Sequence, residues 1–442
     1  MYRLFSWEHS YFSGKARAYL RYKQHAGGLG AGYEDVLATQ ELIQGLLVPA
    51  TGTGAVPQLQ TPDGRFVQDS SEIVDFCEGL HPEPAVVPNP GTAPKQCLAS
   101  YLIELLADEW MVVYAFWERW HYSLSDVTPN HLEFNAQQWG AMLAPDLGGR
   151  ARREAGHAFF ENVFGISRAR TAPQAVFAGL VHLGVTPENE PAWEASNERI
   201  MGLLAEHFSA HDFVLGGRPS LGDFGLMGPL YAHLFRDAVS GFALQTRFPL
   251  VAEWVERTNG TNALNSRTYG QQLYSLDEDR QLVGRPATSD GADWLPKDEL
   301  PSSLEALLGV FFEEMWPVLD STLRVLTEFI ASDAHEAGSE LPGKTFFAGP
   351  GFEHAQTGQG PLTHEFEIGG TRGRRMVAPY QVWMLQRVEG AMKRCTASDA
   401  GRREIAALLG RFDRGPELLE LGERLVGCRV RKEGGRLFSI PG

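Results

Sequence analysis

Short runs of apolar and polar residues alternate along the N-terminal part of the chain. Residues 2–7 and 33–37 have the pattern of short strands. Residues 15–24 and 40–47 place apolar side chains three or four positions apart, which is typical of helices with one buried face. The order strand, helix, strand, helix predicts an α/β unit at the start of the chain.

A β-hairpin and a further helix are predicted directly after these elements. Residues 56–60 and 65–68 flank Asp63-Gly64, a dipeptide that favours a tight turn between two strands. The stretch Asp69-Ser70-Ser71-Glu72 then leads into an apolar run, and a hydroxyl or acidic residue before a glutamate at this spacing marks a helix start. The complete order is therefore β-α-β-α-β-β-α.

The rest of the chain has a mainly helical pattern. Residues 81–91 are rich in proline and glycine and indicate a linker between two domains. Beyond the linker, helices are expected at residues 97–122, 151–164, 192–208 and 221–237, from residue 249, and at 301–330. Further on, we expect a hairpin at residues 364–377, a helix from Pro379 to residue 393, a helix at 400–412 and a strand pair around 434–435.

Composition and charge exclude several classes of protein. The 442 residues exceed one hydrophobic core, which stops growing at about 250–300 residues, so two or three compact domains are expected. The net charge of −16 repels phosphate backbones and argues against nucleic acid as a partner. No run of about 18 apolar residues and no leader-like N-terminus is present, so we expect a cytoplasmic protein that does not cross a membrane.

No metal site is predicted. The four cysteines lie far apart without a C-x-x-C pair, so we expect buried thiols. No H-E-x-x-H spacing joins the histidines and acids of the last part of the chain, so we expect them to be scattered over the surface. The residues considered are Cys77, Cys97, Cys395, Cys428, His335, Glu336, His354, His364 and Glu365.

Three motifs together resemble the glutathione transferase superfamily, of the cytosolic, bacterial-like type. They are Val56-Pro57, Asp69-Ser70 and Ser220-Leu221-Gly222-Asp223, in this order over about the first 260 residues. In the third motif, Ser220 is expected to cap a helix, and Asp223, one turn later, to hydrogen-bond back to Ser220. This pattern indicates a role in folding stability rather than in chemistry.

The resemblance implies a division into three parts. Residues 1–82 are expected to form a thioredoxin-like α/β domain that binds glutathione, and residues 92–285 an all-helical domain. Residues 286–442 exceed the usual length of the family and are expected to form a mixed α+β C-terminal extension. No motif gives this extension a role of its own.

The resemblance also implies glutathione as a co-substrate. The backbone of Val56 would pair with the cysteinyl part of glutathione like an added strand, and a cis bond at Pro57 would suit that geometry. Asp69 would accept from the γ-glutamyl ammonium, and the Ser70 hydroxyl and helix-start amides would hold the carboxylate. The alternative is that Pro57 only shapes a turn and that Asp69-Ser70 only caps a helix.

Three hydroxyl groups are candidates for activating the glutathione thiol. In the family this residue follows the first strand, and counting back from Arg17 favours Ser10, with Tyr11 and Ser13 as alternatives. A hydroxyl that donates a hydrogen bond to the sulfur favours the thiolate and lowers the pKa of the thiol. His9 next to Ser10 does not indicate a hydrolase, because neighbours in a strand face opposite sides and no G-x-S-x-G sequence occurs.

The aromatic helix at residues 97–122 suggests a substrate pocket. The resemblance makes Trp110, Tyr114 and Trp117 candidates for its wall, although aromatic stripes more often serve core packing. Asp108-Glu109 in the same helix could be solvated, could pair with an arginine across a dimer, or could belong to the site.

The function favoured by these features is that of an enzyme that activates glutathione for attack on, or cleavage of, a small apolar electrophile. The alternative is a binding or scaffold protein that keeps the fold without catalysis. A thiol-disulfide oxidoreductase is disfavoured, because no cysteine lies at or near Ser10. By analogy with the family, we expect a homodimer.

Overall fold

A four-stranded sheet organises the N-terminal part of the protein. The computed structural model describes residues 1–123, 127–164, 182–259, 273–276, 278–279, 281–285, 293–342 and 362–441. The strand order is β2-β1-β3-β4, in which β1 runs parallel to β2 and the other neighbours are antiparallel. The strands are β1 (Tyr2–Ser6), β2 (Tyr33–Leu37), β3 (Gln58–Gln60) and β4 (Phe66–Gln68). The predicted thioredoxin-like order and the hairpin at Asp63-Gly64 are therefore confirmed.

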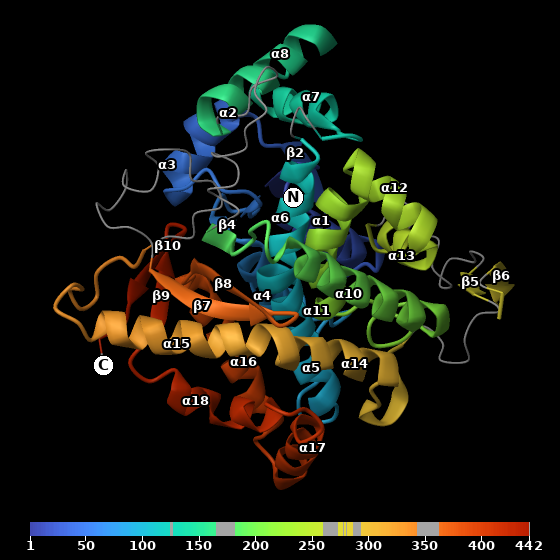
Figure 1. Cartoon of the computed structure of the whole chain (residues 1–442), viewed down its shortest axis with the longest axis vertical. Helices are drawn as coiled ribbons and strands as arrows, with labels where there is room; N and C mark the ends of the chain where they lie inside the picture. The colour runs from blue at the N-terminus through green and yellow to red at the C-terminus, as the bar shows by residue number, and fades with distance from the viewer. Residues whose placement is uncertain are drawn as a thin grey trace.

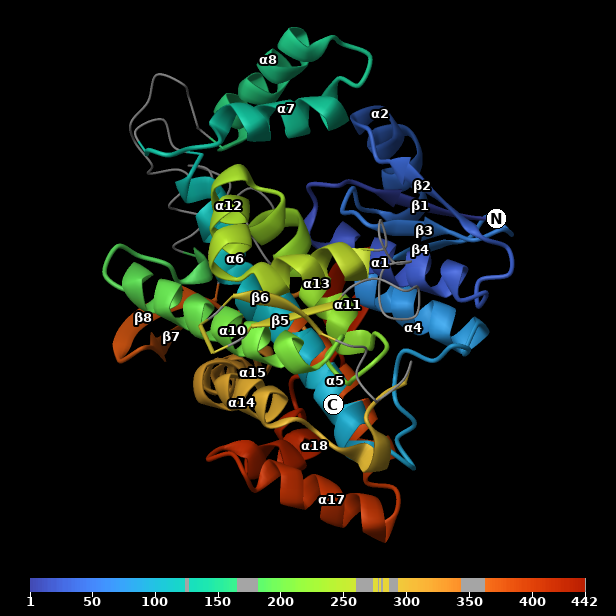
Figure 2. The same ribbon diagram turned by 90° about the vertical axis from the view of Figure 1, so that its right-hand side faces the viewer.

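Helices lie on both sides of this sheet, with α2 above and α4 below in the view of Figure 2. The helical elements are α1 (Tyr11–His25), α2 (Gln40–Leu42), the π-helical turn η1 (Ile43–Leu47), α3 (Val48–Thr51) and α4 (Ser70–Leu80). Asp69 caps α4 in the left-handed region, at φ 98°, and its Oδ1 accepts from the Ser71 N–H at 2.8 Å. The predicted helix start is thus found where the sequence placed it.

A helical region follows the linker. Its elements are α5 (Pro94–Leu106), η2 (Ala107–Met111), α6 (Val112–His121), α7 (Leu132–Leu143), α8 (Gly149–Phe159), η3 (Phe160–Phe164), α10 (Glu190–Ala210), α11 (Leu221–Pro229), η4 (Leu230–Phe235), α12 (Ala238–Arg247) and α13 (Pro249–Asn259). The long helix predicted at residues 97–122 is present, with a π-helical turn, η2, in its middle. Helices α7 and α12 were not predicted.

The C-terminal extension wraps around this helical region, and Figure 1 shows α14 and α15 in line across it. The hairpin strands β5 (Leu273–Leu276) and β6 (Leu282–Arg285) precede the extension. The elements of the extension are η7 (Pro296–Asp298), α14 (Ser302–Val310), η8 (Phe311–Met315), α15 (Trp316–Ile330), β7 (Thr363–Ile368), β8 (Thr371–Met376), α16 (Pro379–Cys395), α17 (Asp399–Leu409), η10 (Gly415–Glu420), α18 (Leu421–Arg424), β9 (Val430–Glu433) and β10 (Arg436–Ser439). Both predicted hairpins of this region and the helix starting at Pro379 are confirmed; the β5–β6 hairpin was not predicted. Residues 343–361, with His354, lie outside the described residues.

One continuous apolar core joins the three parts of the chain. Buried side chains of the N-terminal unit, the helical region and the extension belong to a single cluster, and all four cysteines are buried, as predicted. The predicted capping pair is also present, since Asp223 Oδ2 accepts from the N–H and the hydroxyl of Ser220, both at 2.8 Å. Among the described residues, no helix is long and apolar enough to span a bilayer.

Candidate functional site

A cavity of about 500 Å³ lies between the N-terminal unit and the C-terminal extension. One wall comes from residues 52–57 and 68–70, which surround the ends of β3 and β4. The other wall comes from residues 340–342, from Tyr380 on α16 and from the β9–β10 hairpin. We call it the Asp69 cavity, after the carboxylate in its wall. It contains all four predicted glutathione-binding residues, Val56, Pro57, Asp69 and Ser70.

Val56 is one of the residues that line this cavity, and its side chain packs against the small apolar cluster of Phe5. The Val56-Pro57 peptide bond is cis, and Pro57 O accepts from the Asp69 N–H at 3.4 Å. Within the described part of the chain, neither the N–H nor the C=O of Val56 makes a hydrogen bond. Both groups are therefore available to an extended peptide that lies along this edge.

Asp69 is held as a carboxylate by two groups of the C-terminal extension, Tyr380 and Lys432. Its Oδ2 accepts from the Tyr380 hydroxyl at 2.6 Å and lies 3.0 Å from Lys432 Nζ. Burial by itself would raise the pKa of Asp69, but the positive charge of Lys432 and the hydrogen bonds outweigh it and lower the pKa. Ser70, the first residue of α4, lies beside Asp69 in the wall and is buried.

Lys432 has an almost closed environment. Its side chain is 6% exposed, and its Nζ lies 3.4 Å from Glu72 Oε1 in addition to its contact with Asp69. The ring centroids of Trp383 and Tyr380 lie 4.9 and 5.9 Å from this nitrogen. The ammonium group of Lys432 thus lies between two carboxylates and two aromatic rings.

The three hydroxyl candidates differ in their surroundings. Tyr11 is buried, and its hydroxyl donates to Ala107 O at 2.5 Å, while burial raises the pKa of the phenol well above its usual value. Ser13 is buried, and its Oγ accepts from the Trp7 N–H at 3.3 Å. Ser10 precedes α1 and stays partly exposed. Which of them activates a thiol stays a prediction.

The aromatic candidates lie in the core beside the extension. Trp110 Nε1 donates to Glu314 Oε2 at 3.2 Å, and its ring lies 4.6 Å from that of Trp193. Tyr114 and Trp117 pack against each other with ring centroids 5.3 Å apart. None of Trp110, Tyr114 and Trp117 lines the Asp69 cavity. Their role as a substrate wall stays a prediction.

Asp108 pairs within the chain. Lys15 Nζ lies 2.6 Å from Asp108 Oδ2 and 2.6 Å from Glu104 Oε1, and it donates to Ser71 Oγ at 2.8 Å. Arg387 of α16 completes the group through Glu104 Oε2 at 2.5 Å. This Lys15 cluster fixes the start of α4, and so the wall of the cavity, to α1, α5 and the extension. Burial raises the pKa of Asp108 to about 7, against the attraction of Lys15.

A family comparison identifies the part of the chain that carries this wall. Residues 4–85 match the family model for the N-terminal domain of glutathione S-transferases. This region is a glutathione S-transferase N-terminal domain. The resemblance expected from Val56-Pro57 and Asp69-Ser70 is thereby confirmed. No curated protein matches the chain.

Solved structures similar to the chain include glutathione S-transferases. One from Rhodospirillum rubrum F11 is 15% identical, with 66% of this chain and 99% of that chain covered, at a TM-score of 0.35. Beta-etherase LigF from Sphingobium sp. strain SYK-6 is 18% identical, with 60% of this chain and 96% of that chain covered, at a TM-score of 0.37. A glutathione S-transferase from Methylobacterium radiotolerans, in complex with glutathione sulfonate, is 22% identical, with 62% of this chain and 97% of that chain covered, at a TM-score of 0.30. At these values the likeness does not indicate a substrate.

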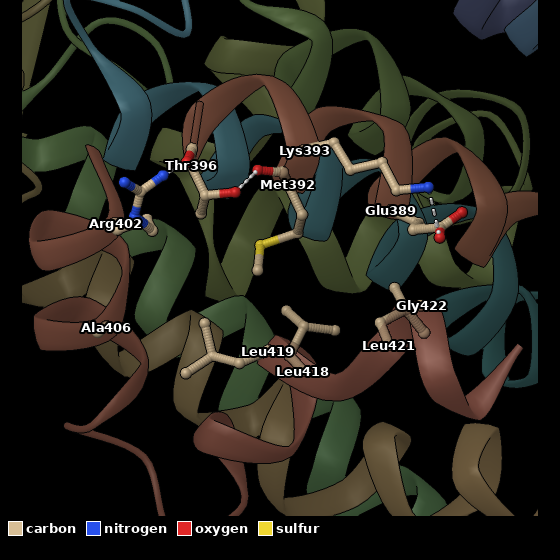
Figure 3. Close-up of a pocket in the computed structure, with 10 residues that line it drawn as sticks. All are labelled: Glu389, Met392, Lys393, Thr396, Arg402, Ala406, Leu418, Leu419, Leu421 and Gly422. Atoms are coloured by element: carbon tan, nitrogen blue, oxygen red, sulfur yellow. Dashed lines mark hydrogen bonds and ion pairs between the residues drawn. The ribbon is translucent and has the colours of Figure 1, made fainter. Parts of the chain in front are cut away.

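A second cavity, of about 420 Å³, lies away from the glutathione S-transferase domain, between α16, α17 and η10 (Figure 3). Its floor is apolar, with Met392 and Leu418 facing each other across the opening. The polar groups at its rim are paired locally: Lys393 binds Glu389 at 2.8 Å. With an apolar floor and a paired rim, it is a poorer candidate for thiol chemistry than the Asp69 cavity.

The two residues of the extension that contact Asp69 were missed by sequence reasoning. Tyr380 stood only as an aromatic position in a predicted helix, and Lys432 lies beside a predicted turn. No local pattern marks either as a partner of the glutathione S-transferase domain. Among the described residues, no group of three His, Cys, Asp or Glu side chains is arranged to hold a metal ion.

Proposed function

We propose that the protein binds glutathione in the Asp69 cavity and activates its thiol for reaction with a small apolar electrophile. The observation that carries this proposal is the free backbone edge of Val56 in one cavity with Ser70 and Asp69 at a helix start. An extended cysteinyl peptide can pair with that edge, while the amides and the hydroxyl at the start of α4 suit a carboxylate. The family match of residues 4–85 supports the same ligand.

Ser10 is the thiol-activating residue in this proposal. Of its rivals, Tyr11 already donates its hydroxyl to Ala107 O, and Ser13 is fully buried. Ser10 does not itself line the cavity; it lies two residues before Phe12, which does, and a hydrogen bond from its hydroxyl would stabilise a thiolate.

Two substitutions separate binding from activation. Titration calorimetry with glutathione should show binding to the unmodified protein and at least tenfold weaker binding to Ser70→Ala. Ser10→Ala should keep its affinity, but the pKa of the bound thiol, followed by thiolate absorbance, should rise by about 1–2 units, the value of one hydrogen bond to a charged group. Ser398→Ala, which removes the cap of α17 instead, is the matched control and should change neither quantity.

A glutathione-binding protein without catalysis is the second candidate. It is favoured by the contact of Lys432 with Asp69, which places a chain segment over the binding wall. This candidate predicts heat of binding without any lowering of the thiol pKa. Absence of binding to the unmodified protein would refute both candidates.

The partners in this proposal are a small electrophile and a second copy of the chain. A homodimer is supported only by the fact that two-fold pairs are the commonest assembly of soluble proteins. Sedimentation equilibrium gives the mass directly, and a species at the monomer mass of 48.8 kDa over the whole concentration range would exclude the dimer.

A further inference from the structure

The Asp69 cavity contains a cation of the protein at the position where a ligand ammonium is expected. Lys432 Nζ lies 3.0 Å from Asp69 Oδ2 and 3.4 Å from Glu72 Oε1. Asp69 is also the acceptor that the proposed glutathione pose assigns to the γ-glutamyl ammonium. One carboxylate would therefore face two ammonium groups at once.

The acceptor capacity of Asp69 is nearly used within the chain. Its Oδ2 receives the Tyr380 hydroxyl at 2.6 Å and the Lys432 ammonium, and its Oδ1 receives the Ser71 N–H at 2.8 Å. A carboxylate oxygen accepts about two hydrogen bonds, which leaves one position on Oδ1. A further ammonium there would also be repelled by Lys432, since the two like charges would share one partly buried site.

The surroundings of Lys432 hold it in place. The side chain is 6% exposed, β9 fixes its backbone, and the faces of Trp383 and Tyr380 flank its ammonium. Displacing it would leave a buried ammonium or a buried carboxylate without a partner, which is costly. The Lys432 ammonium also lies 3.5 Å from Gln68 O, so its donors are used inside the protein, and the Asp69 carboxylate that a ligand meets already has a cation.

We propose that Lys432 is a specificity-determining residue that replaces the ammonium of the ligand, so that the cavity selects cysteinyl peptides whose γ-glutamyl end has no free ammonium group. The inference rests on the proposed function, because it uses the same cavity and the same peptide edge at Val56. It adds the class of ligand: a thiol peptide that has no charged amine at the end facing Asp69 and Lys432.

The test compares two thiol peptides that differ only in the ammonium group. Glutathione and glutaryl-cysteinylglycine, which lacks that amine, are titrated into the unmodified protein, Lys432→Met and Lys432→Arg. The unmodified protein should bind glutaryl-cysteinylglycine at least as tightly as glutathione. Lys432→Met should shift the ratio of the two affinities toward glutathione at least tenfold, and Lys432→Arg should leave the ratio unchanged.

A control and the ratio itself separate this role from mere support of the fold. Lys393→Met removes an exposed lysine of α16, 68% exposed, and should change neither affinity. Loss of structure in Lys432→Met would weaken both ligands together and leave the ratio as it was. An unchanged ratio, or a preference of the unmodified protein for glutathione above tenfold, overturns the inference while the proposed function stands. Absence of binding of both peptides to every form refutes the proposed function as well.

Discussion

Replacing Lys15 with methionine tests whether the Lys15 cluster fixes the wall of the cavity. Its ammonium lies 2.6 Å from both Glu104 and Asp108, and the three side chains are at most 2% exposed. Removing one partner of a buried ion pair costs about 3–5 kcal/mol, because it leaves a charge without compensation.

The structure indicates which carboxylate loses most. Glu104 keeps Arg387 at 2.5 Å, whereas Asp108 has no other cation at this distance among the described residues, and its Oδ1 has no partner there. A lone buried Asp108 must take up a proton on folding. The folded variant then binds this proton more tightly than the unfolded chain does, so its stability falls as pH rises. The loss for Lys15→Met should therefore reach about 3–5 kcal/mol at pH 8 and be smaller at pH 6.

Urea unfolding followed by tryptophan fluorescence measures this loss. Lys15→Met combined with Asp108→Asn should regain about 2 kcal/mol or more at pH 8, because removing both charges of a buried pair is nearly neutral. Lys393→Met is the control, since exposed pairs contribute about 0–1 kcal/mol. A loss below about 1 kcal/mol, or a double variant no more stable than the single one, would refute the reasoning.

Two further predictions concern buried carboxylates. Asp223→Ala removes the acceptor for Ser220, for the Val214 N–H at 2.9 Å and for Trp254 Nε1 at 3.2 Å. The free energy of unfolding should therefore fall by about 3 kcal/mol or more, while the glutathione affinity of the folded protein stays unchanged. A loss of affinity without a loss of stability would contradict this role. Asp108→Asn tests the raised pKa of Asp108, about 7. Because the folded carboxyl holds its proton more tightly than the unfolded one, the unmodified protein should lose stability between pH 5 and pH 8, and the variant should gain about 2–3 kcal/mol relative to it over this range in the same unfolding assay. Parallel pH profiles of the two proteins would contradict the raised pKa.

Elements with strong local signals could be predicted from the sequence. The hairpin at Asp63-Gly64, the start of α4 at Asp69 and the start of α16 at Pro379 depend on turn chemistry and capping within a few residues. The gathering of Val56, Asp69 and Ser70 in one cavity was implied by the resemblance to glutathione transferases rather than by these local signals.

Helix α7 was missed because its packing uses small residues. A side chain on Gly140 would meet Arg152 O at 1.8 Å, and one on Gly156 would meet Ala136 O at 2.0 Å, so backbone contacts make up part of the α7–α8 packing, beside the stacking of Trp139 on Phe159 at 4.9 Å. Such a contact leaves little hydrophobic periodicity in the sequence.

The opposite wall of the cavity could not be predicted, since its contacts are distant in sequence. The Tyr380 hydroxyl reaches Asp69 across 311 positions, and the Lys432 ammonium reaches Gln68 O across 364. Isolated Lys and Tyr residues carry no pattern that specifies a partner, and a charge in a strand is most often solvated. Only the folded extension brings them to the glutathione S-transferase domain.

The two walls of the Asp69 cavity also set an order of events during synthesis. Residues 52–70 leave the ribosome long before β9 and β10, yet the enclosure needs Lys432 and its neighbours. A nascent chain can form the local sheet early, but a closed binding chamber requires contacts of high sequence separation, which form late. Until the β9–β10 hairpin has been translated, the backbone edge at Val56 should therefore be open to solvent.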